Sequence, residues 1–353
     1  LLWIVMGLAA LTFVIGLARG NAPFDVFMAA VALAVGAIPE GLPAAVTIVL
    51  AIGVARMARR RAIIRKLPAV ETLGSTTVVC TDKTGTLTRN EMTVREVFAG
   101  GDHFELTGTG YDPVGELQRQ GAAVALEGFP ALRECLRAGV LCNDAQLRKE
   151  GERVDAQGDP TELALVVAGE KAGVPQAETH RLTPQLDALP FESARMYRAT
   201  LHDRHGGRVI YKVGAVERVL ERCQDALGRD GEKVPLDRDA VHAAVAAMAA
   251  RGLRVLAIAR RHVPADHGRL EHGHVAEGLT FLGLEGMLDP PRPEAMEAVK
   301  NCQAAGIAVK MITGDHLITA RTIGRQIGLR SRGGAEELQA ISGRELEAIS
   351  DAD

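Results

Sequence analysis

Hydrophobic residues dominate the first part of the chain in two long stretches. Residues 1–18 contain no charged side chain, and residues 26–55 contain one, Glu40. A helix needs about 20 apolar residues to cross the hydrocarbon core of a bilayer. The run Arg19–Pro23 between the stretches predicts a short turn. We therefore expect two transmembrane helices within residues 1–55, forming a hairpin in the lipid bilayer, in preference to a buried helix of a soluble protein.

The second apolar stretch is broken in its middle, between Pro39 and Pro43. Two prolines and a glycine free backbone carbonyl groups, which must find partners inside a membrane. A lone carboxylate at that depth, here Glu40, is costly and by default indicates a functional site. Carbonyl and carboxylate oxygens together suit a hard cation such as Ca²⁺. The alternative is a proline kink whose glutamate faces a polar neighbour.

A cluster of basic residues follows the second stretch directly. Positive charge beside a membrane span marks its cytoplasmic side. We therefore expect the stalk and the domains that follow, from residue 56 onward, to be cytoplasmic. The basic residues are Arg56, Arg59, Arg60, Arg61, Arg65 and Lys66.

Beyond this cluster the pattern indicates an α/β fold. The run Thr76–Cys80 predicts a buried strand that ends at Asp82, and residues 307–312 predict a second strand. Helices are expected at residues 294–305 and 320–327, and this alternation is typical of a parallel sheet. Strands, glycine turns and short helices between residues 93 and 285 predict a separate inserted domain, although residues 103–130 read as loops. We assign residues 56–92 and 286–353 to the two parts of the parallel-sheet domain.

Composition excludes several classes of function. The net charge of −3 and an aromatic content of 3% argue against a nucleic-acid partner. Five scattered cysteines without a Cys-x-x-Cys pair argue against disulfides and a zinc site. Four histidines lie in a polar stretch that reads as a solvated loop more readily than as a metal site. They are His262, His267, His272 and His274.

The residues after the first strand have the chemistry of phosphoryl transfer. Asp82 can act as a covalent nucleophile, and Lys83 can offset phosphate charge. Gly85 lets backbone N–H groups approach phosphate oxygens closely. A polar turn without function is the alternative, but Thr313-Gly314-Asp315 follows the second strand in the same way. Two such strand ends suit one phosphate group and one divalent cation.

These motifs together resemble those of the P-type cation-transporting ATPases, and Pro-Glu-Gly-Leu-Pro at residues 39–43 is similar to their calcium-like branch. The resemblance extends over essentially the whole chain. It implies a haloacid-dehalogenase-like parallel-sheet phosphorylation domain, interrupted by an α+β nucleotide-binding domain and preceded by a transmembrane hairpin. It also implies ATP-driven transport, most of all of Ca²⁺, with Na⁺ or H⁺ left open. ATP and Mg²⁺ are the implied cofactors.

The resemblance assigns roles around the two strand ends and in the membrane. Asp82 would attack the γ-phosphate of ATP, with Mg²⁺ held by the Asp82 carboxylate and the Thr84 carbonyl. Phosphate oxygens would be stabilised by Lys83, Thr313 and Gly314, and Asp315 would orient the site. The transported cation would bind Glu40 and the carbonyl groups of Val35, Gly36 and Ile38.

The resemblance also assigns nucleotide contacts. Glu162, in a helix that Asp159 and Pro160 open, would contact adenine, and Phe191 would stack on it. Further contacts would come from Arg195, Gly214, Arg254, Asp289 and Arg292. One motif departs from the family, because relatives read Lys-Gly-Ala where this chain reads Lys212-Val213-Gly214-Ala215. Adjacent strand residues face opposite sides, so either Lys212 reaches round or the local register differs.

Other family motifs are absent from this sequence. They are the Thr-Gly-Glu-Ser actuator motif, the Gly-Asp-Gly-x-Asn-Asp stretch and the later membrane helices. We therefore expect a fragment that needs the remaining segments of a parent pump for transport. Two alternatives remain: a soluble haloacid-dehalogenase-type phosphatase, and a nucleotide-binding remnant without catalysis.

Overall fold

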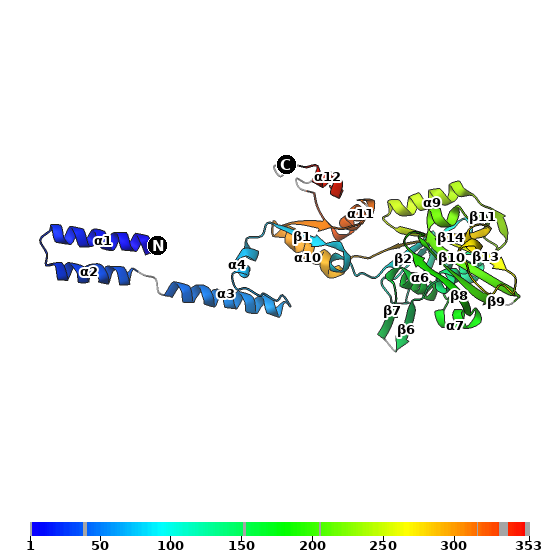
Figure 1. Ribbon diagram of the computed structural model, residues 1–353, viewed down its shortest axis with the longest axis horizontal. Helices are drawn as coiled ribbons and strands as arrows, with labels where there is room; N and C mark the ends of the chain where they lie inside the picture. The colour runs from blue at the N-terminus through cyan, green and yellow to red at the C-terminus, as the bar shows by residue number, and fades with distance from the viewer. Residues whose placement is uncertain are drawn as a thin grey trace. The chain divides into compact units, whose positions relative to one another are not determined.

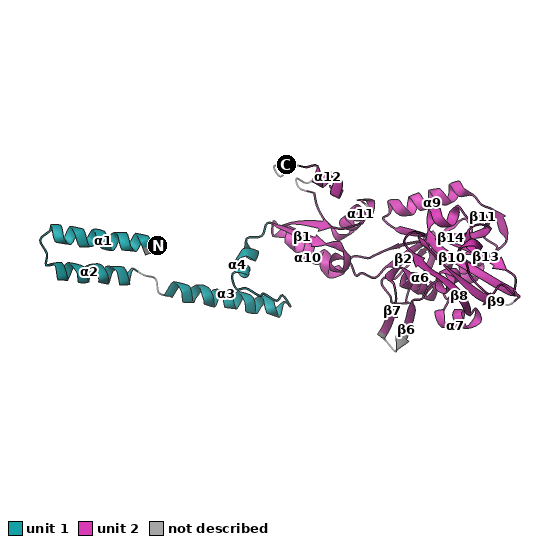
Figure 2. Ribbon diagram, viewed as in Figure 1, with its two compact units in different colours: residues 1–77 teal, residues 78–353 magenta. Residues whose placement is uncertain are grey.

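The computed structural model describes residues 2–37, 41–150, 153–204, 206–315, 317–331 and 338–349. The chain divides into two compact units, Leu1–Thr77 and Val78–Asp353 (Figure 2).

The first unit is helical. Helices α1 (Leu2–Ala18) and α2 (Pro23–Gly36) run antiparallel, side by side (Figure 1), and are followed by α3 (Gly41–Arg59) and α4 (Ala69–Gly74). The expected turn between α1 and α2 is confirmed. A Cβ atom on Gly16 would lie 2.4 Å from Val26 Cγ1, so glycine is needed where these two helices meet.

A search of the described residues of this unit finds one stretch that is long and apolar enough to cross a membrane, judged by length and composition. It covers Pro23–Arg59, and α1 is a shorter apolar helix. The expected interruption at residues 39–43 falls partly on residues 38–40, which lie outside the described residues. Pro43 lies within α3, near the first of its described residues.

In the second unit, a small parallel sheet carries the two expected strand ends. Strands β1 (Val78–Asp82) and β15 (Ala308–Ile312) pair in register, with Asp82 opposite Ile312. Helices α10 (Pro293–Ala304) and α11 (Leu317–Ile327) accompany β15, which confirms the predicted helix–strand–helix order. A short helix, α12 (Gly343–Glu347), follows them.

The prediction of a buried first strand is wrong for alternate residues. Val78 on β1 is 44% exposed, Ile312 on β15 is 61% exposed, and Cys80 is exposed as well. The sheet has two strands in the described residues, and the apolar cluster of Leu87, Val299, Ile323 and Ile327 packs against partly buried Val309 and Met311. Alternate strand residues face away from that cluster.

The inserted segment forms one large, mainly antiparallel sheet of 11 strands. Its path runs β5-β4-β3-β2-β14-β13-β10-β9-β8, and β11 pairs with both β14 and β12. The strands are β2 (Thr93–Ala99), β3 (Asp102–Leu106), β4 (Leu117–Arg119), β5 (Ala122–Ala123), β8 (Gln185–Glu192), β9 (Tyr197–Arg204), β10 (Gly207–Ala215), β11 (Cys223–Leu227), β12 (Lys233–Pro235), β13 (Arg254–Val263) and β14 (Leu279–Leu288). Residues 103–130 were expected to form loops, and here β3, β4 and β5 correct that expectation. Their short runs, separated by glycine turns, leave too little periodicity to identify strands.

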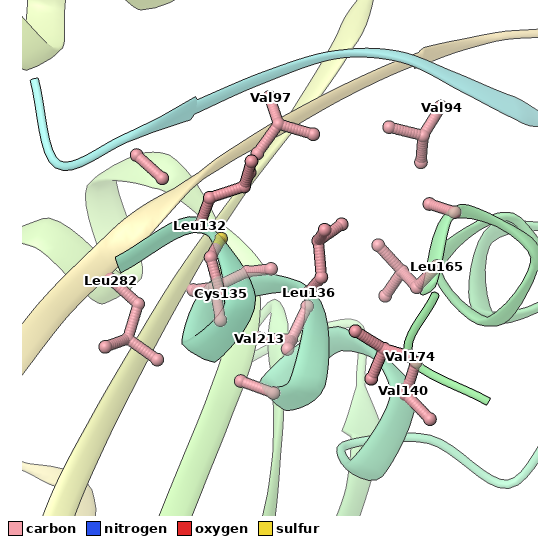
Figure 3. Packing of buried hydrophobic residues seen from close by; sticks show 14 of the residues in the cluster. Val94, Val97, Leu132, Cys135, Leu136, Val140, Leu165, Val174, Val213 and Leu282 are labelled. Atoms are coloured by element: carbon pink, nitrogen blue, oxygen red, sulfur yellow. The ribbon is translucent and has the colours of Figure 1, made fainter. Parts of the chain in front are cut away.

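Helices cover both faces of this sheet. One face packs against α5 (Pro130–Leu141) and α6 (Pro160–Lys171), whose apolar side chains interlock with Val97, Val213 and Leu282 of the strands (Figure 3). The other face packs against α8 (Val216–Leu220) and α9 (Arg238–Ala250). The remaining elements are α7 (Gln176–Leu182), the hairpin of β6 (Gln146–Glu150) and β7 (Arg153–Gln157), and the 3₁₀ turns η2 (Leu126–Gly128) and η3 (His272–Val275). A mixed α/β fold that contains a parallel sheet and a mainly antiparallel sheet is thus confirmed.

Two connecting segments join the small sheet to the large one, and they run side by side. Thr93 of β2 pairs with Leu288 of β14, and Thr88 forms an isolated bridge with Pro291. The backbone N–H of Arg292 donates to the carbonyl oxygen of Leu87 at 2.9 Å. The chain therefore leaves the small sheet and returns to it through one narrow hinge.

Candidate active site

The parallel pairing of β1 with β15 brings the two strand-end motifs to one edge of the small sheet. Lys83 Nζ and Asp315 Oδ2 lie 2.5 Å apart and link the motifs directly. Lys83 is buried, whereas Asp315 is partly exposed. The Asp315 N–H donates to Thr313 Oγ1 at 3.1 Å, which shapes the second motif. Asp82, at the end of β1, is exposed beside this pair.

The turn after Asp82 presents its backbone to solvent. In η1 (Lys83–Leu87), Thr84 has extended dihedral angles, and Gly85 has a φ of 72° that favours glycine. The turn is closed by Thr88, whose N–H donates to the Lys83 carbonyl oxygen at 3.0 Å and whose Oγ1 lies 3.1 Å from the same oxygen. The exposed residues of the turn are Thr84, Gly85 and Thr86.

The structure places Asp289 and Arg292 in the hinge. Thr88 Oγ1 donates to Asp289 Oδ2 at 2.5 Å, and the Glu91 N–H donates to Asp289 Oδ1 at 3.3 Å. Arg292 donates to the carbonyl oxygens of Thr88, at 2.8 Å, and Gly85, at 3.2 Å. Arg292 therefore touches the turn that follows Asp82, whereas the buried Asp289 carboxylate has both oxygens engaged by the hinge.

The first turn of α6 holds the residue expected to contact adenine. Asp159 caps this helix, with Oδ1 accepting from the N–H groups of Thr161 and Glu162, at 2.8 and 3.4 Å, which confirms the predicted helix start. Glu162 Oε1 accepts from Arg198 at 3.2 Å, and Oε2 accepts from the Asp144 N–H at 3.0 Å. The Glu162 side chain remains 20% exposed, so part of it is accessible to solvent.

Arg198 is a residue of this region that the sequence did not single out. Its side chain on β9 is 8% exposed and forms ion pairs with both Asp144 and Glu162. Burial lowers the pKa of Arg198, but the hydrogen bond to Asp144 and the charge of Glu162 outweigh burial and raise it. The sequence signal that could have identified Arg198 is a lone arginine in the otherwise apolar start of a buried strand.

Lys212 lies on the opposite side of the sheet from Glu162. Its Nζ donates to the Val275 carbonyl oxygen at 3.1 Å and lies 3.9 Å from the centroid of the Tyr197 ring. Burial lowers its pKa to about 7. Val213, not Lys212, pairs with Arg198 and faces α5 and α6. Lys212 therefore does not reach round, and its placement does not support the expected nucleotide contact.

The other expected nucleotide residues border this region. Phe191 on β8 is 54% exposed, and Arg195 Nε donates to Glu192 Oε2 at 2.9 Å. Gly214 is tightly enclosed, because a Cβ atom there would lie 2.4 Å from the Met196 carbonyl oxygen. Arg254 begins β13 and is exposed. The roles of these residues remain predictions.

The expected cation ligands are only partly within the described residues. Val35 and Gly36 lie in the last turn of α2. Ile38 and Glu40 lie outside the described residues.

Comparison with known proteins identifies the class. Residues 131–294 match the protein family described as P-type ATPase, cytoplasmic domain N. The whole chain is 53% identical to "Cation-transporting ATPase pma1" of Synechocystis, of which it covers 39%. Over 99% of its length it is 36% identical to a "Calcium-transporting ATPase" of Bacillus subtilis, again covering 39% of that protein. Over 97% it is 39% identical to the human "Calcium-transporting ATPase type 2C member 1", covering 36%.

The chain therefore contains the cytoplasmic domain N of the P-type ATPases, and along its whole length it is similar to proteins named as cation- and calcium-transporting ATPases. It spans about two fifths of the length of these relatives.

Proposed function

We propose that this chain is the part of an ATP-driven cation pump that carries the phosphorylated aspartate and the nucleotide-binding domain. The observation that carries the proposal is the juxtaposition of Asp82 with the Lys83–Asp315 ion pair at one sheet edge. Such an edge is where open α/β folds bind ligands. The relatives, named as cation and calcium transporters, support the same function.

In the proposed reaction, a carboxylate oxygen of Asp82 attacks the γ-phosphorus of ATP. The bond from the γ-phosphorus to the bridging oxygen breaks, ADP leaves, and an aspartyl-phosphate forms, which water later hydrolyses. Lys83 and the backbone N–H groups around Gly85 and Gly314 offset the negative charge on the transferred group. Thr313 adds a hydroxyl, and Asp315 keeps Lys83 in place.

The residues at this edge fit Mg²⁺. Magnesium prefers oxygen ligands, few of them from protein and several from phosphate and water. Asp82 offers an exposed carboxylate, and the extended backbone at Thr84 leaves its carbonyl group outside any helix. Bound there with ATP, Mg²⁺ would neutralise phosphate charge.

We further propose that the chain is anchored in the lipid bilayer by its first unit, with the second unit cytoplasmic. Support comes from the apolar stretch Pro23–Arg59 and from the basic residues at its end, Arg56 and Arg59. The transported cation is proposed to be Ca²⁺, bound by Glu40 and the carbonyl groups of Val35, Gly36 and Ile38. Na⁺ and H⁺ are the competing cargoes.

Covalent labelling tests the proposal directly. Membranes containing the full chain are incubated with γ-³²P-labelled ATP and Mg²⁺ across a Ca²⁺ series, beside an Asp82→Asn variant. We expect an acid-stable, hydroxylamine-sensitive label on the wild type and none on the variant, because an amide cannot form the acyl phosphate. Dependence on Ca²⁺ would support that cargo.

Asp315→Asn serves as the matched carboxylate substitution in the same site. It weakens the pairing with Lys83 but leaves the nucleophile, so label formation is expected to slow without disappearing. ATP binding without any covalent label on the wild type would contradict the phosphorylation mechanism and indicate a nucleotide-binding remnant.

A further inference from the structure

We propose that Arg198 is a positioning residue that fixes the Glu162 carboxylate for recognition of the adenine base, and so sets the preference for ATP over GTP. This inference rests on the proposed function, because it assumes that the large domain, which contains the 11-stranded sheet, binds a nucleotide at Glu162. It assigns a role to a residue whose contacts the sequence did not anticipate.

The first support is how firmly Glu162 is held. Arg198 contacts Oε1, and the backbone N–H of Asp144 contacts Oε2, so the two carboxylate oxygens are fixed by different elements. Arg198 also pairs with the Asp144 side chain, which joins the three residues into one unit. Each carboxylate oxygen has a second lone pair free to accept another hydrogen bond.

The second support is the rigidity of the turn that carries Asp144. Asn143 is buried, and its side-chain amide donates to the carbonyl oxygens of Gly139 and Val140, at 2.7 and 3.1 Å. Its Oδ1 accepts from the Ala145 N–H at 3.1 Å. The Asp144 N–H is thus held at the end of α5, and a carboxylate bound to it has a defined orientation.

The third support is the position of Arg198 within the sheet. It pairs directly with Val213, next to the Gly214-Ala215 sequence, on the sheet face that packs against α5 and α6. Lys212, its neighbour on β10, faces away. Arg198 therefore supplies positive charge beside Glu162. It does so from β9, directly opposite the β10 position at which this chain has Val213.

The fourth support is the cost of burying Arg198. The Arg198 Nε is buried and has no hydrogen-bond partner within the described residues. A guanidinium that is 8% exposed and only partly satisfied is costly, and a shorter apolar side chain would avoid that cost. The cost is consistent with a role in holding Glu162 and Asp144.

The chemistry of the two bases explains the proposed selectivity. Adenine carries an exocyclic amino group that donates to a carboxylate, whereas guanine has a carbonyl oxygen at the corresponding position, which a carboxylate repels. The discrimination requires that the carboxylate stay ionised and fixed. Arg198 provides both, because its charge favours the ionised form and its hydrogen bond fixes the orientation.

The test measures the dissociation constants of Mg–ATP and Mg–GTP by calorimetry on the full chain in lipid nanodiscs. The variants are Arg198→Met, Glu162→Gln and the double variant. Arg204→Met is the matched control, because Arg204, at the other end of β9, loses a comparable buried pairing, with Glu134. In Arg198→Met we expect about tenfold weaker ATP binding and GTP binding changed by less than about twofold, since one charge-assisted hydrogen bond supports the base contact.

In the Glu162→Gln background, adding Arg198→Met should not change the ratio of the ATP and GTP dissociation constants, because Arg198 acts through Glu162. Arg204→Met should leave the ratio unchanged even where it lowers stability. The same ratio in Arg198→Met as in wild type would overturn this inference alone. Failure of the wild-type chain to bind ATP would overturn the proposed nucleotide function and the inference with it.

Discussion

At the scale of single residues, Glu285 is the least satisfied buried charge-bearing group among the described residues. Its side chain on β14 is fully buried, and neither carboxylate oxygen has a hydrogen-bond partner in the described part of the chain. Burial raises the pKa of Glu285 well above its ordinary value. Gly139 on α5 leaves it room, since a Cβ atom there would lie 3.0 Å from Glu285 Oε1.

This burial predicts a pH-dependent stability. Because the folded-state pKa of Glu285 is above the unfolded-state value, the folded chain binds the proton more tightly, and stability falls as pH rises from the unfolded pKa toward the folded one. Glu285→Met removes the titration and the unpaired oxygens, so it should stabilise the second unit by about 1–3 kcal/mol near neutral pH. Thermal unfolding from pH 5 to pH 8 measures the difference.

The stabilisation by Glu285→Met should grow with pH, by at most about 1.4 kcal/mol per pH unit for a single titrating group. Glu134→Met is the opposite case, because Glu134 is buried with Arg204, Arg260 and Tyr211 as partners, so the same substitution should destabilise. A pH-independent difference between Glu285→Met and the wild type would contradict the raised pKa of Glu285.

The sequence alone identified many of the residues at the strand ends, but it did not identify the residues that hold Glu162. Asp82, Lys83 and Asp315 follow apolar strands, and that local pattern is sufficient to place them at a sheet edge. Arg198 and Asp144 lie on separate elements and meet Glu162 only in the folded sheet. Their partnership depends on strand pairing far along the chain, which no local pattern encodes.

At the scale of elements, a buried hydroxyl group links the two segments of the hinge between the two sheets. Thr88 is fully buried. Its backbone N–H donates to the Lys83 carbonyl oxygen, in the turn after β1, and its hydroxyl group donates to the Asp289 carboxylate, just after β14. The two connecting segments therefore share a hydrogen bond as well as a backbone bridge.

Removing that hydroxyl should loosen the hinge. Thr88→Val leaves Asp289 Oδ2 buried without this donor, at a cost of about 1–3 kcal/mol. We expect faster backbone hydrogen exchange in peptides covering residues 86–93 and 288–293, measured by mass spectrometry. Thr107→Val is the control, because the Thr107 hydroxyl accepts from Glu116 in a loop of the large sheet. Unchanged hydrogen exchange at the hinge in Thr88→Val would contradict this prediction. It would show that the backbone pairing alone holds the two segments together.

Helix ends were the most predictable elements. Asp159-Pro160 opens α6 as expected because cap and proline effects act within one turn. The short strands β3 to β5 were missed because they have too few residues for periodicity. The exposure of β1 was missed because burial is set by neighbouring strands and helices, not by the strand's own composition.

At the scale of the whole molecule, the reactivity of the cysteines can test the proposed cytoplasmic location of the second unit. Cys80 is exposed and Cys302 half-buried, whereas Cys135, Cys142 and Cys223 are buried. Burial raises the pKa of Cys142 to about 11 and that of Cys223 to about 12, so these thiols should also react slowly.

In a Cys302→Ser background, a membrane-impermeant maleimide should therefore label mainly Cys80, and only in inside-out vesicles. Cys80→Ser in the same background should abolish most of the label. Labelling in sealed right-side-out vesicles would contradict the cytoplasmic assignment. Denaturant should make the three remaining thiols reactive as well, again in inside-out vesicles.

The pairing of Thr93 with Leu288 also has a consequence for the order in which the molecule assembles. Once β2 and β14 are paired, the chain between β1 and β15 behaves as a short loop, so the entropy cost of closing a long one no longer opposes their parallel alignment. The large domain should therefore fold before the edge that carries Asp82 and Asp315 forms. Inherited substitutions that weaken the core around α5 would then abolish phosphorylation at a distance, in molecules whose reactive residues are all intact.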